Sequence, residues 1–132
     1  MTAPGTQTRA GEWFDALAVD TPQHRLVLTR VAPDAVELTE FWSAEGHRGT
    51  GWFKTVLTAL CHEADDRGET LCVTLPARPS HPNAGGRLRR LMISRRFRVN
   101  NARTTAHPRP DIHAGMVRAP FPAPPRKEDP AR

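Results

Sequence analysis

A cluster of glycines followed by a helical pattern marks where the chain could bind an anion. The loop AEGHRGTG contains Gly46, Gly49 and Gly51, with Arg48 among them, and the helical pattern WFKTVLTALCHEADDRG follows at once. Such a loop directs several backbone N–H groups and the positive end of a helix dipole at one spot, which suits a phosphate or pyrophosphate. The alternative is a connection that only needs positive φ or a tight bend.

Glu40 is the candidate acid–base residue, because it precedes this loop on an extended segment, VELTEFWS. By the two-residue period of a strand, Glu40 shares a face with Val36 and Leu38, so a carboxylate falls among apolar neighbours. A carboxylate in such a setting can serve as a general base. A β-bulge would move it to the other face, and an edge or bulge position without a catalytic role is the alternative.

A strand, loop, helix and strand must position these groups. Residues 36–43 form the second arm of a predicted antiparallel hairpin with residues 24–31, a helix is predicted over 52–67, and residues 70–76 alternate as a second strand. Two strands joined by one crossover helix lie parallel in a sheet. A ligand at the carboxyl ends of these strands would therefore face the glycine loop.

Further segments flank this core. Trp13, Phe14 and Leu17 recur at helical spacing, which predicts a short amphipathic turn or helix that covers part of the core. The segment RLRRLMISRRF, residues 87–97, predicts a second helix with apolar residues inward and arginines outward, and residues 111–118 predict a closing strand. The order of elements indicates a mixed α/β (α+β) fold.

Length and composition indicate one small domain. We expect a flexible N-terminus over 1–11, a single domain over 12–118 and an extended Pro-rich tail over 119–132 of the 132 residues. Apolar runs fall short of the roughly 20 residues of a membrane span, and no hydrophobic secretion signal is apparent, so we expect a cytoplasmic protein with no membrane partner. Cys61 and Cys72 are expected to be core residues, and we predict no metal site.

Residues 48–53, RGTGWF, resemble a motif of a known family in both sequence and position. Their place between strand and helix is similar to the acetyl-CoA-binding core of the GNAT superfamily of N-acetyltransferases. The loop of that family is written Arg/Gln-x-x-Gly-x-Gly/Ala, and Arg48 and Gly51 match it. Phe53 stands where the family has Gly or Ala.

A second segment carries the same resemblance. RRLMISRRFRV is similar to the family's helix with Leu-Tyr followed by Gly-Phe, with Leu91 and Phe97 at the matching positions. Met92 replaces the Tyr, which often serves as the acid in this family, and Arg96 replaces the Gly. The segment HAGMVRAP resembles the closing strand, so the likeness covers roughly residues 36–118.

The resemblance implies a GNAT-like acyltransferase that transfers an acetyl group from acetyl-CoA to an amine acceptor. Backbone N–H groups at 49–54 would bind the pyrophosphate, a backbone N–H near 41–43 would bind the acetyl carbonyl, and Glu40 would be the base. Arg87 or Arg90 would meet the 3′-phosphate. The residues thus implied in binding the co-substrate are Phe41, Trp42, Ser43, Arg48, Gly49, Thr50, Gly51, Trp52, Phe53, Lys54, Arg87 and Arg90.

The distribution of charge supports two alternatives. The chain has 17 Arg against 2 Lys and a net charge of +5, and residues 70–110 contain no Asp or Glu. The Arg-rich segment 78–109 could therefore bind nucleic acid through its phosphate backbone. Alternatively, the chain could be a catalytically inactive GNAT-fold interaction or assembly module, with the Pro-rich tail lying along a protein partner.

Overall fold

A computed structural model gives the fold of the chain, and it describes residues 11–44, 46, 51–75 and 84–122. Some of the expectations above concern residues outside these ranges, namely most of the N-terminal segment, Arg48, Gly49, Thr50 and the tail from residue 123 onward.

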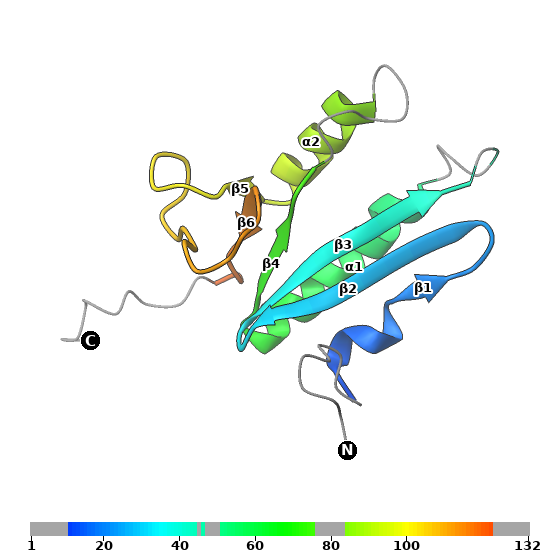
Figure 1. The fold of residues 1–132 in the computed structure, drawn as a ribbon, viewed down its shortest axis with the longest axis horizontal. Coiled ribbons are helices and arrows are strands. Elements are labelled where there is room, and N and C mark those ends of the chain that lie inside the picture. Colours follow the sequence, from blue (N-terminus) through cyan, green and yellow to red (C-terminus); the bar gives the residue numbers. More distant parts are fainter. Residues whose placement is uncertain (1–10, 45, 47–50, 76–83, 123–132) are drawn as a thin grey trace.

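The described residues form a mixed α/β (α+β) fold, as the sequence predicts (Figure 1). One six-stranded sheet has the order β1-β2-β3-β4-β6-β5, in which β3 and β4 are parallel and the other neighbouring pairs are antiparallel. The elements in chain order are the 3₁₀ helix η1 (Trp13–Ala16), β1 (Val19–Asp20), β2 (His24–Ala32), β3 (Ala35–Ser43), α1 (Trp52–Arg67), β4 (Thr70–Val73), α2 (Ala84–Ser94), β5 (Arg98–Val99) and β6 (Met116–Arg118).

The hairpin of β2 and β3 contains a β-bulge. Val27 pairs with Glu40 and the next residue, Leu28, pairs with Leu38, so Thr39 is an extra residue on β3. The Thr39 hydroxyl donates to the carbonyl oxygen of Val27 at 3.2 Å, which holds the extra residue in place. One added residue reverses the alternation of side chains between the two faces of the sheet. Even-numbered residues of β3 therefore face the core before the bulge, and odd-numbered residues face it after the bulge.

The main core lies between the sheet and the helices. α1 crosses the face of the sheet that Figure 1 shows behind β2 and β3, and it ends at Gly68, whose φ of 67° suits a glycine cap. Burial of apolar surface on this face is the main source of stability. The buried residues of this core are Phe14, Leu26, Leu28, Val36, Leu38, Leu57, Leu60, Cys61, Ala64, Leu71, Val73, Met92, Phe97 and Met116.

A loop between β5 and β6 covers part of the opposite face. Its residues Ile112 and Ala114 pack with Cys72 and Val117 of the sheet. The side-chain amide of Asn100 donates to three carbonyl oxygens of the same loop, at 3.0 to 3.3 Å. These bonds hold the segment as an ordered loop, which is why the closing strand begins at Met116 and not at the predicted residue 111.

Other element bounds also differ from those predicted. β4 ends at Val73 instead of residue 76, because Thr74 leaves the ladder and accepts a hydrogen bond through its side chain. α2 begins at Ala84, earlier than predicted, and ends at Ser94 instead of residue 97. The segment near Trp13 is a single 3₁₀ turn. The sequence did not predict β1 and β5, which are two residues each.

Two ion-pair clusters join distant parts of the chain. Arg30 binds Glu12 at 2.6 Å and Glu69 at 3.1 Å, and the three side chains are only 11%, 9% and 15% exposed. Arg109 binds Asp34 and Asp111, both at 2.9 Å. Both clusters lie near the hairpin turn and the start of β4, so they tie the N-terminal segment and the β5–β6 loop to this end of the sheet.

Candidate functional site

The two parallel strands part halfway along β3. Their pairing runs from Ala35 with Thr70 to Leu38 with Val73, and β3 then continues to Ser43. Within the described ranges, no residue pairs with the second half of β3 on the side of β4. A strand edge with unpaired N–H and C=O groups can accept an extended ligand.

The chain after β4 follows β6 and not β3. The backbone N–H of Gly115, which leads into β6, donates to the Thr74 hydroxyl at 3.1 Å. A side chain at Gly115 would lie within 4.0 Å of the backbone of Val73 and Thr74, so these segments are in close contact. This attachment accounts for the divergence, since Thr74 is held away from the second half of β3.

The N-terminus of α1 faces the same end of the sheet. Gly51 precedes the helix with φ 84° and ψ 2°, a left-handed conformation that favours glycine, and no side chain caps the helix there. The first intrahelical bond runs from the Thr55 N–H to the Gly51 oxygen, so the N–H groups of Phe53 and Lys54 have no acceptor within the helix. The first turn contains no acidic residue, and Lys54 is exposed. These features suit an anion.

Aromatic residues line the junction of β3 with α1. The rings of Phe41 and Phe53 stack with centroids 5.0 Å apart, and both pack against the core. The Phe53 ring therefore points into the protein, which leaves its backbone on the side of the loop. Trp52 stacks on His24 at 4.1 Å, and the Nδ1 atom of His24 lies 3.0 Å from the Ser43 hydroxyl.

Glu40 does not lie among apolar side chains, so this expectation is wrong. The bulge at Thr39 turns Glu40 to the face opposite α1, where it is exposed and binds the Arg25 guanidinium. Trp42, two residues further along β3, lies on the same face as Glu40 and is 43% exposed. An exposed carboxylate with a guanidinium partner is a weaker base candidate than one held in an apolar setting. Its catalytic role stays a prediction.

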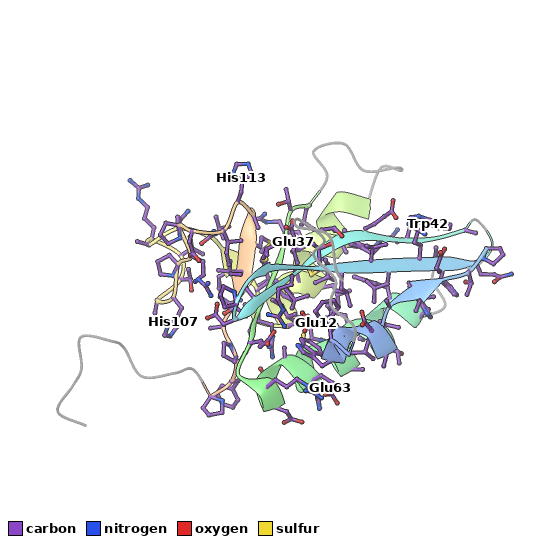
Figure 2. The ribbon with its side chains drawn as sticks, turned by 60° about the horizontal axis from the view of Figure 1, so that its bottom comes forward. Glu12, Glu37, Trp42, Glu63, His107 and His113 are labelled. Carbon is purple, nitrogen blue, oxygen red and sulfur yellow. The ribbon has the colours of Figure 1, made fainter. Side chains whose placement is uncertain are left out.

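Glu37 is a second carboxylate on this face, and the sequence reasoning missed it. It is half-buried beside the point where β3 and β4 part, and it pairs in register with Cys72. Burial raises the pKa of Glu37, while the nearby His113 acts in the opposite direction. Figure 2 shows Glu37, His113 and Trp42 on the side of the sheet away from α1, with Glu63 on the other side.

α2 places its arginines on the surface. Arg87 and Arg90 are exposed, while Leu88 and Leu91 pack against the core and Met92 is fully buried, as the helical pattern predicts. The position at which the GNAT pattern has Tyr is therefore inside the core. No described contact joins the two arginines to the N-terminus of α1, so their role in binding a phosphate stays a prediction.

Arg96 adopts a backbone conformation that favours glycine. Its φ is 75°, in the left-handed region, and the following residue, Phe97, is fully buried.

Neither a metal site nor a relative identifies the chain. Within residues 11–44, 46, 51–75 and 84–122, no three His, Cys, Asp or Glu side chains gather to hold a metal ion. Cys61 and Cys72 are buried free thiols, as expected. None of the helices in these ranges is long and apolar enough to cross a membrane. Comparison with protein-family models, curated proteins and solved structures gave no match.

Proposed function

We propose that the protein is an N-acyltransferase that uses acetyl-CoA. The observation that carries this proposal is the opening between β3 and β4 at the end of the sheet that α1 begins. The strand order, with α1 between β3 and β4 and α2 between β4 and β5, fits the resemblance to the GNAT superfamily. Diverging parallel strands beside a helix N-terminus can hold a long ligand that ends in a pyrophosphate.

The co-substrate would enter along the free edge of β3. Its pyrophosphate would accept hydrogen bonds from the N–H groups of Phe53 and Lys54, with the Lys54 ammonium close by. The pantetheine arm would then extend beside residues 39–42 and bond to backbone groups that no described strand pairs with on the side of β4. Arg87 or Arg90 on the surface of α2 would contact the 3′-phosphate.

The transfer itself exchanges a thioester for an amide. The amine nitrogen attacks the thioester carbonyl carbon, the C–N bond forms and the C–S bond breaks. One proton leaves the amine and one proton is taken up by the departing thiolate. Glu37 is the stronger candidate for the base, because burial raises its pKa above the ordinary value, and Glu40 is the alternative. A water molecule can protonate the thiolate, since Met92 occupies the position of the family's Tyr.

Binding of acetyl-CoA can be tested with two matched glycine variants. Gly51→Ala and Gly68→Ala both place a methyl group on a left-handed glycine at one end of α1, and neither methyl group meets an atom within 4 Å. We expect acetyl-CoA to raise the melting temperature of the native protein and of Gly68→Ala, but to shift Gly51→Ala much less. The absence of any shift at millimolar acetyl-CoA would remove the proposal.

Catalysis can be tested by following the release of free CoA thiol with a panel of amines. We expect Glu37→Gln to lower kcat by about 100-fold and Glu40→Gln to have a smaller effect. The rate for the native protein should rise with pH through the raised pKa of Glu37, and this rise should disappear in Glu37→Gln. If only Glu40→Gln abolishes transfer, Glu40 is the base.

The surface of α2 favours nucleic-acid binding as a second candidate function. Arg87, Arg89 and Arg90 are exposed within one turn of α2, and none has an ion-pair partner among the described residues. Binding through phosphates should weaken steeply as salt rises, with a slope that falls when one of these arginines is replaced by Gln. No binding to DNA or RNA at low salt would exclude this function.

A further inference from the structure

A small polar hollow lies away from the proposed acyl-transfer site. It has a volume of about 250 Å³ and lies between the second half of α1, the end of α2 and the end of β6. Ligand pockets for drug-sized molecules have volumes of roughly 300 to 1,000 Å³, so this hollow suits a smaller group. Its lining residues are Thr58, Cys61, His62, Asp65, Ser94, Arg95, Arg96 and Arg118.

One ion pair in the wall of the hollow is internally satisfied. Arg118 donates to both carboxylate oxygens of Asp65, at 2.8 and 3.0 Å, and its Nε donates to the Arg95 carbonyl oxygen. The backbone N–H of Phe121 also donates to Asp65, at 2.8 Å. Arg118 and Asp65 therefore cancel each other's charge and leave the other two arginines to set the charge of the hollow.

Arg95 is a half-buried cation without a counter-ion among the described residues. Its Nε and Nη2 atoms donate to the Thr58 hydroxyl at 3.2 and 3.1 Å, and Nη1 donates to the Ser94 hydroxyl at 3.3 Å. All of these acceptors are neutral. By contrast, the half-buried guanidinium groups of Arg30 and Arg109 each bind two carboxylates. Charges taken out of water are normally paired, so Arg95 lacks an anion.

Arg96 occupies a position where glycine would be more favourable. Its φ of 75° is strained for any residue with a Cβ atom. The described contact of its guanidinium is with the Phe121 ring, 4.2 Å from the centroid, and it has no carboxylate partner within the described ranges. Arg96 therefore places a second guanidinium at the hollow that Arg95 lines.

We propose that this hollow binds a phosphate group, either as inorganic phosphate or as the terminal group of a phosphate monoester. The guanidinium groups of Arg95 and Arg96 would supply charge and paired donors that match phosphate oxygens. The hydroxyl groups of Thr58 and Ser94 donate to the carbonyl oxygens of Lys54 and Leu91 and accept from Arg95, so they orient the Arg95 guanidinium. His62 lies at the same wall. The site is separate from the N-terminus of α1, so this proposal holds or fails independently of acetyl-CoA binding.

Calorimetric titration with sodium phosphate, at constant ionic strength set with sodium chloride, tests the proposal. We expect saturable binding of one phosphate, weakened about tenfold or more by Arg95→Gln and by Arg96→Gly. Arg103→Gln changes an exposed arginine of the same Arg-rich segment and should leave binding unchanged. Gly51→Ala should also leave it unchanged, which separates this hollow from the helix N-terminus.

Arg96→Gly keeps the experiment interpretable if Arg95→Gln fails to fold. Glycine suits the backbone conformation of residue 96, so we expect this variant to melt at or near the native temperature while it loses phosphate binding. Glycerol 2-phosphate in place of inorganic phosphate distinguishes the two sources of the group. The proposal is overturned if neither probe saturates the native protein, or if Arg103→Gln weakens binding as much as Arg96→Gly.

Discussion

The two halves of β3 differ in the strands that pair with them. The first half, residues 35–38, pairs with β4 in a parallel ladder, and the buried cluster of Arg30 and the more exposed cluster of Arg109 lie at that end. The second half pairs with β2 alone among the described residues, and at that end α1 begins after a left-handed Gly51 without a side-chain cap. We call the half of β3 that pairs with β4, residues 35–38, the closed end, and the other half, beside the start of α1, the open end.

This difference separates stability from binding. At the closed end each buried charge has a partner, and backbone groups pair across the sheet, so little is left to bind a ligand. At the open end a strand edge and the first amides of a helix are not used by the ladder or by the helix. Changes at the closed end should therefore alter stability most, and changes at the open end should alter binding most.

The largest loss of stability is expected from Arg30→Met at the closed end. Methionine removes the guanidinium that lies over the Phe14 ring and binds the buried carboxylates of Glu12 and Glu69. Removing one partner of a buried ion pair costs about 3–5 kcal/mol. Urea unfolding should show this loss, whereas acetyl-CoA binding by the folded variant should be unchanged. A loss of unfolding free energy below about 1 kcal/mol would mean that the Arg30 cluster does not stabilise the closed end.

A smaller loss, about 2 kcal/mol, is expected from Asp65→Asn in the last turn of α1, where Asp65 binds Arg118 at the end of β6. Desolvation acts to raise the pKa of Asp65, but hydrogen bonds from Arg118 and Phe121 outweigh it and lower the pKa below the ordinary 3.8. The stability that Asp65 contributes is therefore present above about pH 4 and is lost as pH falls through the lowered pKa. Unfolding measured from pH 7 to pH 2 should show less acid destabilisation in the variant than in the native protein.

The sequence predicts the closed end of the fold well. The spacing of Leu57, Leu60 and Ala64 places them on one helical face, and Gly68 ends α1 as predicted. The crossover rule gives parallel β3 and β4, which the register confirms. These features follow from local periodicity and from the length of a connection, both of which are visible in the chain itself.

The open end could not be predicted in the same way. The bulge at Thr39 depends on a hydrogen bond across the hairpin to Val27, and it reversed the expected face of Glu40. By the two-residue period of the strand, Glu37 would face solvent. It is half-buried because a loop far along the chain, near His113, lies beside it. The polar hollow likewise combines α1, α2 and β6. Tertiary contacts of this kind leave no local pattern in a sequence.

A gain in stability of roughly 0.5 kcal/mol at pH 7 is expected from Glu37→Gln, in the paired half of β3 beside the point where β3 and β4 part. Burial raises the pKa of Glu37, with His113 opposing it, so the folded protein holds a proton more tightly than the unfolded chain does. The stability that this carboxyl contributes is therefore present at low pH and is lost as pH rises through the raised pKa. Chemical unfolding at pH 7 and at pH 4 should show the gain only at the higher pH. A loss of stability in Glu37→Gln at pH 7 would mean that the Glu37 carboxylate stabilises the folded protein.

The smallest effect, about 0.3 kcal/mol, is expected from Glu63→Gln on the surface of α1. Glu63 and Arg67 form an i, i+4 pair at 3.3 Å with both side chains about half exposed, at 46% and 50%. Water and salt screen such a pair, and exposed helical pairs contribute only about 0.3–0.5 kcal/mol. Urea unfolding at low and high salt should show a small loss that disappears at high salt. Glu63 with Arg67 is an Arg–Glu pair like Arg30 with Glu69, but it is exposed. If Glu63→Gln lost as much stability as Arg30→Met, burial would not explain why one ion pair stabilises the fold more than the other.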